Sequence, residues 1–246
     1  MTTKTIHKKV FEHAFGECFY WNMWEKEGNM LYIGVDLGTS AVKLLLMNAE
    51  GKIESVVSKE YPLYFPHPGW SEQNPEDWWS AVLEGLKELT ENCDKSQIAG
   101  ISFGGQMHGM VALDENDDVI RPAILWNDGR TQKQTDYLNN VIGKETLSKY
   151  TANIAFAGFT APKILWMKEE EPENFARTKM IMLPKDYIAF KLSGVYSTDV
   201  SDASGMLIFD VKNKCWSKEM LDICGITEAQ VPKIFQSYET VGTILP

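Results

Sequence analysis

Three apolar runs lie close together near the start of the chain, and only tight turns separate them. They cover residues 31–37, 41–47 and 53–58, and Leu, Ile or Val recurs in each. The connections are too short to hold a helix, and strands joined in this way pair antiparallel. The second connection, Asn48-Ala49-Glu50-Gly51, is typical of a hairpin turn. We therefore predict that a three-stranded meander opens the folded domain.

Strands and helices are mixed in the rest of the sequence. Asn74 followed by Pro75 and two acidic residues carries the signals of a helix start, and the helix is predicted over 75–92. Strands mixed with helices imply an α/β fold, in which helices cover a sheet. Further helices are predicted at 131–142, 144–150, 161–168, 172–177, 184–192 and 217–224, strands at 97–102, 110–113, 119–126 and 179–183, and an extended polar segment at 196–204.

The composition is that of an ordinary soluble protein. The 246 residues are 44% hydrophobic and 24% charged, and the formal net charge is −10. A nucleic-acid binder needs clustered Lys and Arg, which the sequence lacks. No apolar stretch approaches the ~20 residues that cross a bilayer, so no membrane partner is expected. The four cysteines form no C-x-x-C pair, which argues against a zinc site or a disulfide framework, and the cytoplasm is the expected compartment.

Residues 1–29 stand apart, because they show no clear period and precede the first strand. We exclude them from the predicted fold and begin the domain at residue 30. Two interpretations stay open. Either Met30 is the true start and the leader results from a mis-assigned start, or the leader is an aromatic docking tail. The tail would use Phe19, Tyr20, Trp21 and Trp24.

The first candidate site is the turn Asp36-Leu37-Gly38-Thr39-Ser40. A buried strand ends there in an acid, and a glycine turn then presents two hydroxyl groups. Backbone N–H groups and the hydroxyls of Thr39 and Ser40 could bind phosphate oxygens, while Asp36 could hold a hydrated Mg²⁺. A plain β-turn that begins with Asp is the simpler alternative. The turn is not a P-loop, since G-x-x-x-x-G-K-[ST] does not occur.

Two further segments carry side chains suited to a sugar. In Gly104-Gly105-Gln106-Met107-His108-Gly109 the glycines let the backbone approach a ligand, and Gln106 and His108 offer hydrogen-bonding groups to hydroxyls. In Trp126-Asn127-Asp128-Gly129-Arg130 the indole offers a flat surface to a sugar face, and Asp128 and Arg130 can bind hydroxyls. The alternatives are a structural histidine, a core tryptophan and a surface salt bridge.

In their order and spacing these three segments resemble those of xylulokinases, which belong to the FGGY carbohydrate kinases. The resemblance covers residues 30–246 and includes four more segments, at 66–73, 158–163, 183–187 and 198–205. Asp-Leu-Gly-Thr-Ser is shared across the superfamily, whereas Gln-Met-His-Gly is typical of xylulokinases among FGGY members. The resemblance implies a ribonuclease H-like domain of the actin and hexokinase type, with a mixed sheet flanked by helices.

The resemblance also implies a chemistry, the ATP-dependent phosphorylation of D-xylulose to D-xylulose 5-phosphate. Asp36 would lie near Mg²⁺, bound through water, and near the γ-phosphate of ATP. Thr39 and Ser40 would line the same pocket. The residues implied for substrate binding are Gln106, Met107, His108, Trp126, Asp128 and Arg130, of which the last two either touch the sugar or shape their loop.

The same resemblance places the catalytic base, an aspartate in a Gly-Gly-Asp context, in a second domain. That motif does not occur up to Pro246. We therefore expect that the carboxy-terminal domain is absent, that ATP is shared with this missing lobe, and that the chain alone is inactive. Asp199 and Asp202 are expected to be structural. A homodimer of the full-length enzyme, another FGGY substrate such as ribulose, gluconate or glycerol, and a non-catalytic sugar-binding module stay open.

Overall fold

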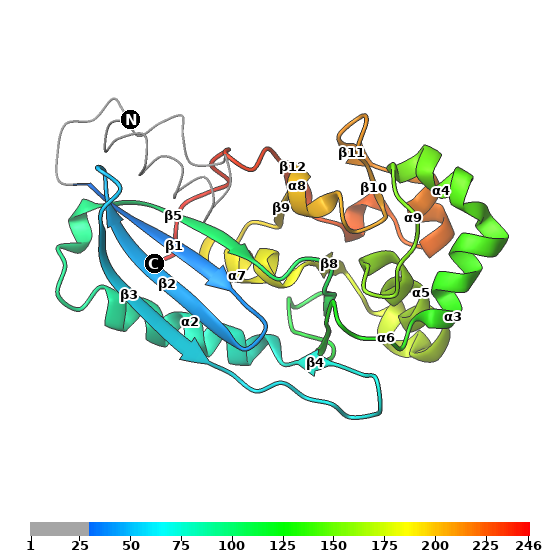
Figure 1. The fold of residues 1–246 in the computed structure, drawn as a ribbon, viewed down its shortest axis with the longest axis horizontal. Helices are drawn as coiled ribbons and strands as arrows, with labels where there is room; N and C mark the ends of the chain where they lie inside the picture. Colours follow the sequence, from blue (N-terminus) through cyan, green and yellow to red (C-terminus); the bar gives the residue numbers. More distant parts are fainter. Residues whose placement is uncertain (1–29) are drawn as a thin grey trace, which may run out of the picture. The chain divides into compact units, whose positions relative to one another are not determined.

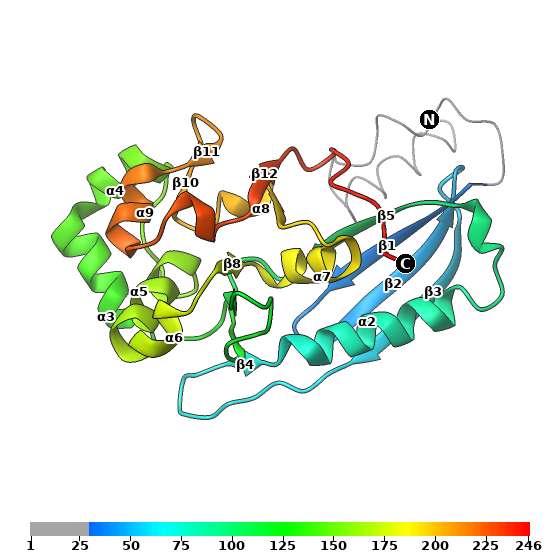
Figure 2. The ribbon, with the colours of Figure 1, turned by 180° about the vertical axis from the view of Figure 1, so that it is seen from behind.

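The computed structural model describes residues 30–246, so both interpretations of residues 1–29 lie outside the described part. The described chain divides into two units, and each takes several segments of the sequence. Figures 1 and 2 show the elements of both units from opposite sides. Unit 1 contains residues 30–61, 78–105 and 237–240, and unit 2 contains residues 62–77, 106–236 and 241–246.

A four-stranded mixed sheet forms unit 1, in the order β3-β2-β1-β5 (Figure 1). Strands β1 (Leu31–Leu37), β2 (Ala41–Asn48) and β3 (Ile53–Glu60) pair antiparallel, and β1 pairs in parallel with β5 (Ile98–Gly105). The side chain of Asn48 stabilises the β2–β3 turn by accepting hydrogen bonds from two backbone N–H groups. The predicted meander and the mixed sheet are both confirmed.

Helix α2 (Pro75–Leu89) connects β3 to β5, and its residues from Trp78 onward pack on one face of the sheet. An ideal Cβ on Gly85 would lie 2.4 Å from Leu44 Cδ1, so the glycine lets the helix approach β2 closely. Trp78 and Val82, one turn apart, are fully buried. A parallel pair of strands needs such a crossover, and α2 supplies it. The predicted helix is confirmed, with its end three residues earlier than expected.

Unit 2 is built from helices and short two-stranded sheets. The sheets pair β4 (Glu72–Gln73) with β7 (Ala123–Ile124), β6 (Val111–Leu113) with β8 (Met180–Met182), β9 (Ser197–Asp199) with β12 (Lys233–Phe235), and β10 (Phe209–Asp210) with β11 (Cys215–Trp216). The helices are α3 (Gln132–Tyr137), the π-helix η3 (Leu138–Gly143), α4 (Lys144–Thr151), α5 (Thr160–Glu170), α6 (Pro172–Ala176), α7 (Pro184–Ser193), α8 (Val200–Ala203) and α9 (Lys218–Cys224). Two 3-10 turns, η2 (Lys95–Gln97) in unit 1 and η4 (Glu228–Gln230) in unit 2, complete the described elements.

The segment predicted to be extended over 196–204 is only partly so. Strand β9 ends at Asp199, and the following residues form the short helix α8. The carboxylate of Asp199 caps this helix by accepting hydrogen bonds from the backbone N–H groups of Ser201, at 2.8 Å, and Asp202, at 3.3 Å. An N-cap aspartate therefore turns an otherwise polar, strand-like segment into a helix.

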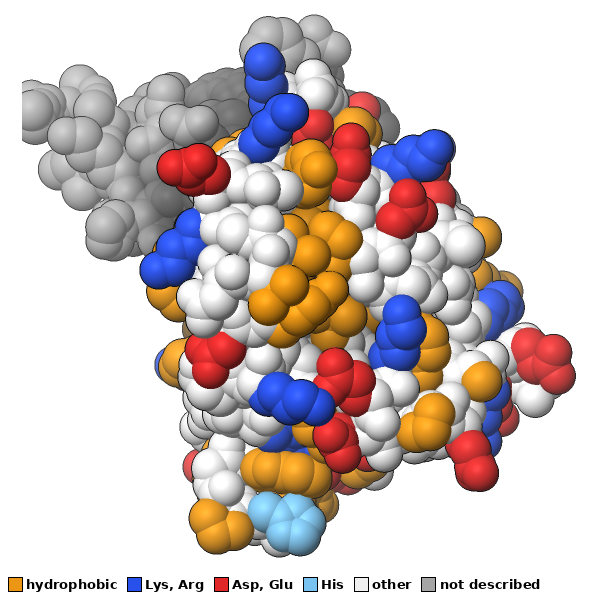
Figure 3. Space-filling view, turned by 90° about the vertical axis from the view of Figure 1, so that its right-hand side faces the viewer, with side chains coloured by type: hydrophobic (Ala, Val, Ile, Leu, Met, Phe, Trp, Pro, Cys, Tyr) orange, Lys and Arg blue, Asp and Glu red, His pale blue; other side chains and the backbone are white. Residues whose placement is uncertain are grey.

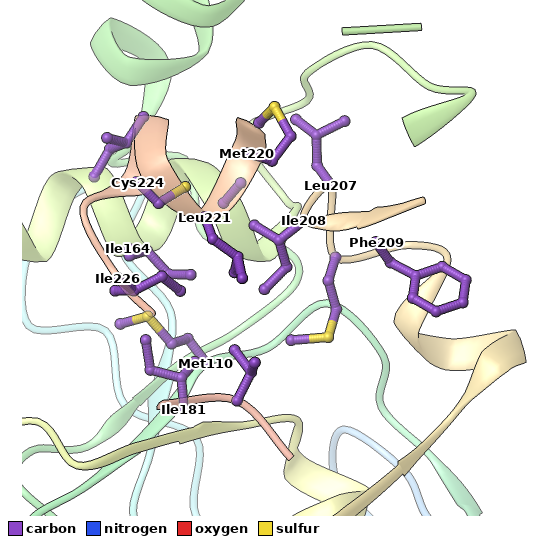
Figure 4. Packing of buried hydrophobic residues seen from close by; sticks show 14 of the residues in the cluster. Met110, Ile164, Ile181, Leu207, Ile208, Phe209, Met220, Leu221, Cys224 and Ile226 are labelled. Carbon is purple, nitrogen blue, oxygen red and sulfur yellow. The ribbon is translucent and has the colours of Figure 1, made fainter. Parts of the chain in front are cut away.

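The core of unit 2 is a cluster of buried apolar side chains (Figure 4). Ile164 from α5 and Cys224 from α9 are fully buried in it, together with Ile208. Burying an isoleucine side chain is worth about 1.5–3 kcal/mol. This core fixes the position of α5, and with it Lys163, the residue before Ile164.

Some apolar side chains of unit 2 stay at the surface. Figure 3 faces the side that carries α3 and α4 and shows a stripe of hydrophobic side chains between charged ones. Tyr137 on α3 is 42% exposed, and Val141 on η3, between α3 and α4, is 70% exposed. Within residues 30–246, no helix is long and apolar enough to span a membrane.

Candidate functional site

The first candidate site lies in unit 1, where β1 ends beside β5. The register pairs Asp36 with Gly104 and Leu37 with Gly105, so β5 continues three residues beyond its predicted end. An ideal Cβ on Gly105 would lie 2.6 Å from the carbonyl oxygen of Leu37, whereas one on Gly104 would meet nothing within 4 Å. Gly105 therefore permits the close approach of the two strand ends. Gly104 is the partner of Asp36 in the register, and the space that a side chain at Gly104 would occupy is open.

The turn after β1 is fixed by hydrogen bonds. The N–H of Gly38 donates to the carbonyl oxygens of Asp36, at 3.2 Å, and Ala41, at 3.1 Å. An ideal Cβ on Gly38 would lie only 2.9 Å from the carbonyl oxygen of Ala41. The hydroxyl of Tyr61 donates to the carbonyl oxygen of Gly38. Burial raises the pKa of Tyr61, and the charge of Asp36 adds to this rise, so the phenol stays a hydrogen-bond donor.

The side chains predicted to meet phosphate and Mg²⁺ face solvent in this turn. Asp36 and Ser40 are exposed, and Thr39 is partly exposed. Among residues 30–246, no group of three or more His, Cys, Asp or Glu side chains is placed to hold a metal ion. A single carboxylate still suits Mg²⁺, which keeps several waters and takes other ligands from phosphates. The exposed position of Asp36 is compatible with binding hydrated Mg²⁺, and this role stays a prediction.

His108 is the centre of the second candidate site, which lies in unit 2. Its backbone φ is 68°, in the left-handed region that residues with a side chain rarely adopt. The imidazole stacks on the ring of Phe159, with centroids 4.7 Å apart and 27° between the planes. Its Nδ1 lies 2.9 Å from the carbonyl oxygen of Gly205. A carbonyl oxygen only accepts, so Nδ1 of the neutral ring carries the proton and Nε2 is an acceptor.

The backbone at Gly205 leaves room for this imidazole and for nothing more. An ideal Cβ there would lie 2.2 Å from Cε1 and 2.6 Å from Nδ1 of His108. Burial lowers the pKa of His108, and the charge of Lys163 lowers it further. The hydrogen bond to Gly205 and the charge of Asp202 act in the opposite direction. The result is a neutral imidazole at physiological pH.

The other residues predicted for the sugar differ in exposure. Met107 is 47% exposed and Trp126 is 48% exposed, so both present large apolar side chains at the surface. Gln106 is buried, and its Nε2 donates to Oε1 of Gln73 at 3.0 Å. The side chain of Gln73 in turn donates to the carbonyl oxygen of Pro62. These hydrogen bonds indicate that Gln106 anchors its own segment.

Asp128 and Arg130 are buried and hold each other. The Arg130 side chain is 1% exposed, and its Nε and NH2 donate to Asp128 at 2.9 Å and 2.7 Å. Its NH2 also lies 2.7 Å from Glu72, and its guanidinium lies 3.6 Å above the ring of Trp70. Asp128 accepts a further hydrogen bond from the N–H of Ser71 at 2.6 Å. These contacts favour the alternative in which both residues shape the loop of Trp126 over direct contact with a sugar.

Asp199 and Asp202 also form structural contacts. Both pair with Lys185 on α7, at 2.7 Å and 3.1 Å, and Asp186 lies 3.0 Å from the same ammonium. Burial raises the pKa of Asp186, while the charge of Lys185 opposes this rise. The ion pairs connect α7 to β9 and α8, and α8 leads directly to Gly205.

Lys163 contacts His108, and the sequence did not single it out. It is fully buried in α5, and its Nζ donates to the carbonyl oxygens of His108, at 3.0 Å, and Phe159, at 3.2 Å, and to that of Gly158. The signal was a lysine within a segment that already carried the family resemblance. Nothing local in the sequence shows that it points at His108, because 55 residues separate the two.

A cavity of about 490 Å³ lies in unit 2. Asn127, next to Trp126 in the sequence, forms part of its wall, and His108 does not. The other lining residues are Phe65, Pro66, His67, Pro68, Gly69, Trp70 and Ser71. The aromatic and proline side chains give this cavity a mostly apolar wall.

Comparison with known proteins decides the family. The amino-terminal domain of the FGGY family of carbohydrate kinases matches residues 31–246. The chain belongs to this family. It is 46% identical over 216 residues to the xylulose kinase of Bacillus subtilis, covering 87% of the chain and 43% of that protein. It is 45% identical over 219 residues to the xylulose kinase of Lactococcus lactis, with the same coverage.

Solved structures of FGGY kinases share the fold. A xyloylose kinase from Brucella ovis superimposes with a TM-score of 0.84 at 39% identity, covering 87% of this chain and 45% of that one. A gluconate kinase from Lactobacillus acidophilus gives a TM-score of 0.84 at 32% identity, covering 89% and 44%. The predicted α/β fold of the actin and hexokinase type is thereby confirmed. The chain spans a little less than half the length of these relatives.

Proposed function

We propose that this FGGY chain provides the sugar-binding part of an ATP-dependent kinase that phosphorylates the 5-hydroxyl of D-xylulose. The observation that carries the proposal is the setting of His108. A neutral imidazole donates through Nδ1 to Gly205 and keeps Nε2 as an acceptor. The curated relatives of 46% and 45% identity are named xylulose kinases, which favours this ketose.

The chemistry of a ketopentose suits this setting. Each sugar hydroxyl is a hydrogen-bond donor that Nε2 of His108 can accept. The C–H face of a sugar packs on aromatic and thioether side chains, and the exposed side chains of Trp126 and Met107 would provide such a surface. Asp128 and Arg130 would act indirectly, by holding the loop that carries Trp126.

The turn after β1 would meet the phosphate end of the reaction. Bound Mg²⁺ would neutralise charge on the transferred phosphoryl group, and Asp36 would hold it through water. Thr39, Ser40 and the N–H groups of the turn would bind phosphate oxygens. Phosphoryl transfer depends on positioning all reactants together, and the resemblance assigns the base to the part of the family outside the matched domain. We therefore propose that the 246-residue chain alone binds the sugar without turning it over.

Isothermal titration calorimetry with the 246-residue chain tests the proposal. D-Xylulose is expected to bind, and His108→Ala is expected to weaken its binding roughly 5- to 150-fold, since a sugar hydroxyl left without its acceptor costs about 1–3 kcal/mol. A parallel assay of ADP release with ATP and Mg²⁺ is expected to show no xylulose-dependent turnover. Equal binding of D-xylulose by wild type and His108→Ala would refute the role of the site.

A second substrate is favoured by one observation. The gluconate kinase from Lactobacillus acidophilus superimposes as well as the xyloylose kinase from Brucella ovis. The same calorimetric titration with D-gluconate, D-ribulose and glycerol discriminates between these substrates. Tighter binding of D-gluconate than of D-xylulose would replace the first proposal with the second.

A further inference from the structure

The ammonium of Lys163 is an unusual group in unit 2, because a lysine is almost never fully buried unless its charge is compensated. Three carbonyl oxygens surround its Nζ, those of His108 at 3.0 Å, Phe159 at 3.2 Å, and Gly158. An ammonium has three N–H donors, so all three can be used. Nζ therefore acts as a junction between two segments that are far apart in the sequence.

The three carbonyls belong to residues around the candidate sugar site. The rings of His108 and Phe159 stack on each other. Gly158 lies against the loop of Trp126, because an ideal Cβ on Gly158 would be 2.4 Å from the Trp126 carbonyl oxygen. The Lys163 ammonium thus binds the backbone of His108 and Phe159, whose rings stack on each other. It also binds the backbone of Gly158, which lies against the backbone of Trp126.

The backbone of His108 needs such support. A left-handed conformation in a residue with a side chain costs of order 1–3 kcal/mol, and it persists only where the surroundings enforce it. The carbonyl oxygen of His108 accepts from Nζ of Lys163 and from Oγ1 of Thr160, at 3.1 Å. Both donors lie on α5, which the core of unit 2 fixes.

We propose that Lys163 is a positioning residue of the sugar site, whose ammonium ties the carbonyls of His108, Gly158 and Phe159 into the one arrangement that presents the His108 ring to the sugar. The identity of the sugar rests on the proposed function, but the hydrogen bonds from Lys163 to the three carbonyls do not. No role in proton transfer is implied, because Nζ faces carbonyl oxygens.

The positive charge of Lys163 also affects the pKa of His108. The positive charge of Lys163 adds to burial in lowering the pKa of His108, whereas the Gly205 carbonyl and Asp202 raise it. Burial lowers the pKa of Lys163 itself to about 7, with Asp128 raising and Arg130 lowering it. His108 titrates below its ordinary value, and the charge of Lys163 is one cause of that lowering. Removing the charge should therefore raise the pKa of His108.

Three variants distinguish the effect of the Lys163 hydrogen bonds from the effect of its charge. Lys163→Met removes donors and charge at similar length, and Lys163→Arg keeps the charge. Thr160→Val is the matched control, because it removes the other donor to the same His108 carbonyl and leaves the charge in place. The readouts are the pKa of His108, from an NMR titration of its ring protons, and the dissociation constant for D-xylulose from calorimetry.

Lys163→Met is expected to raise the pKa of His108. It is also expected to weaken the binding of D-xylulose at least about tenfold, which corresponds to about 1.4 kcal/mol. Lys163→Arg and Thr160→Val are expected to leave the pKa of His108 at its wild-type value. An unchanged affinity in folded Lys163→Met overturns the positioning role. An unchanged pKa of His108 in that variant overturns the charge coupling.

The wild-type chain decides the matter if Lys163→Met does not fold. With ¹⁵N-labelled lysine, the Lys163 ammonium signal, assigned by its loss in Lys163→Arg, is expected to shift on addition of D-xylulose together with the His108 ring signals. A His108 response without a Lys163 response overturns the proposal. Failure of wild type to bind D-xylulose at all refutes the proposed function instead, and the sugar-free titration of His108 still tests the influence of Lys163.

Discussion

Gly205→Ala is expected to displace the His108 ring. The new Cβ would lie 2.2 Å from Cε1 and 2.6 Å from Nδ1 of His108, and real contacts of this kind are essentially never below 3.0 Å. The ring must therefore move by roughly 1 Å, a shift that breaks the 2.9 Å hydrogen bond to the Gly205 carbonyl and disturbs the stack on Phe159.

The two lost contacts lie within the protein, and they lower the free energy of unfolding by about 1–3 kcal/mol together. The loss of affinity comes from the displaced Nε2, because a bound sugar hydroxyl left without its acceptor costs about 1–3 kcal/mol. This cost corresponds to a loss of D-xylulose affinity of roughly 5- to 150-fold. Gly205 lies between Ala203 and Met206, two members of the buried cluster, so the melting temperature should fall as well.

Calorimetry with D-xylulose measures this loss, and circular dichroism follows the melting temperature. Gly100→Ala is the matched control, because an ideal Cβ there makes only ordinary contact with the Tyr32 ring, at 3.7 Å. The control is expected to bind D-xylulose as wild type does. Wild-type affinity in Gly205→Ala would refute the role assigned to the Nδ1 hydrogen bond.

Asp128→Asn should lower the free energy of unfolding by about 3 kcal/mol, because it removes one of the two carboxylates that pair with the buried guanidinium of Arg130; a change below about 1 kcal/mol in urea unfolding would contradict this. The pKa of His108 is lowered in the folded chain, so its stabilising contribution is present above pH 6.5 and is lost as the pH falls through the folded value. Urea unfolding at pH 7.5 and pH 5 should show a larger loss in wild type than in His108→Gln, and equal losses would count against it. Burial raises the pKa of Cys224 to about 12, so a thiol reagent should label the exposed Cys215 in the native chain and Cys224 only after unfolding.

The meander and the turn after β1 could be predicted because their signals are local. The apolar runs and the short turns fix the pairing of the first three strands whatever the rest of the chain does. Gly38 and Asp36 lie within one turn, so their geometry follows from neighbours in the sequence. Their position beside Gly104 and Gly105 could not be predicted from local signals, because the pairing of β1 with β5 depends on the crossover through α2.

The geometry of the candidate sugar site could be predicted only in part, because it depends on tertiary contacts. Asp128 and Arg130 looked like polar groups for hydroxyls, yet Glu72 and Trp70, more than 50 residues earlier, hold them in a buried network. Lys163 carried no local signal of its contact with His108. Tertiary partners, rather than residue type, decide which polar side chains stay available to a ligand.

The central claim is that Nε2 of His108 receives a hydrogen bond from a sugar hydroxyl while Nδ1 stays bound to Gly205. The most direct test is ¹⁵N NMR of the His108 ring in the wild-type chain, recorded without and with saturating D-xylulose. The account predicts that the Nε2 resonance moves on addition of the sugar and that Nδ1 stays protonated. Both ring nitrogens unchanged at saturating D-xylulose, or Nδ1 without its proton, would contradict it.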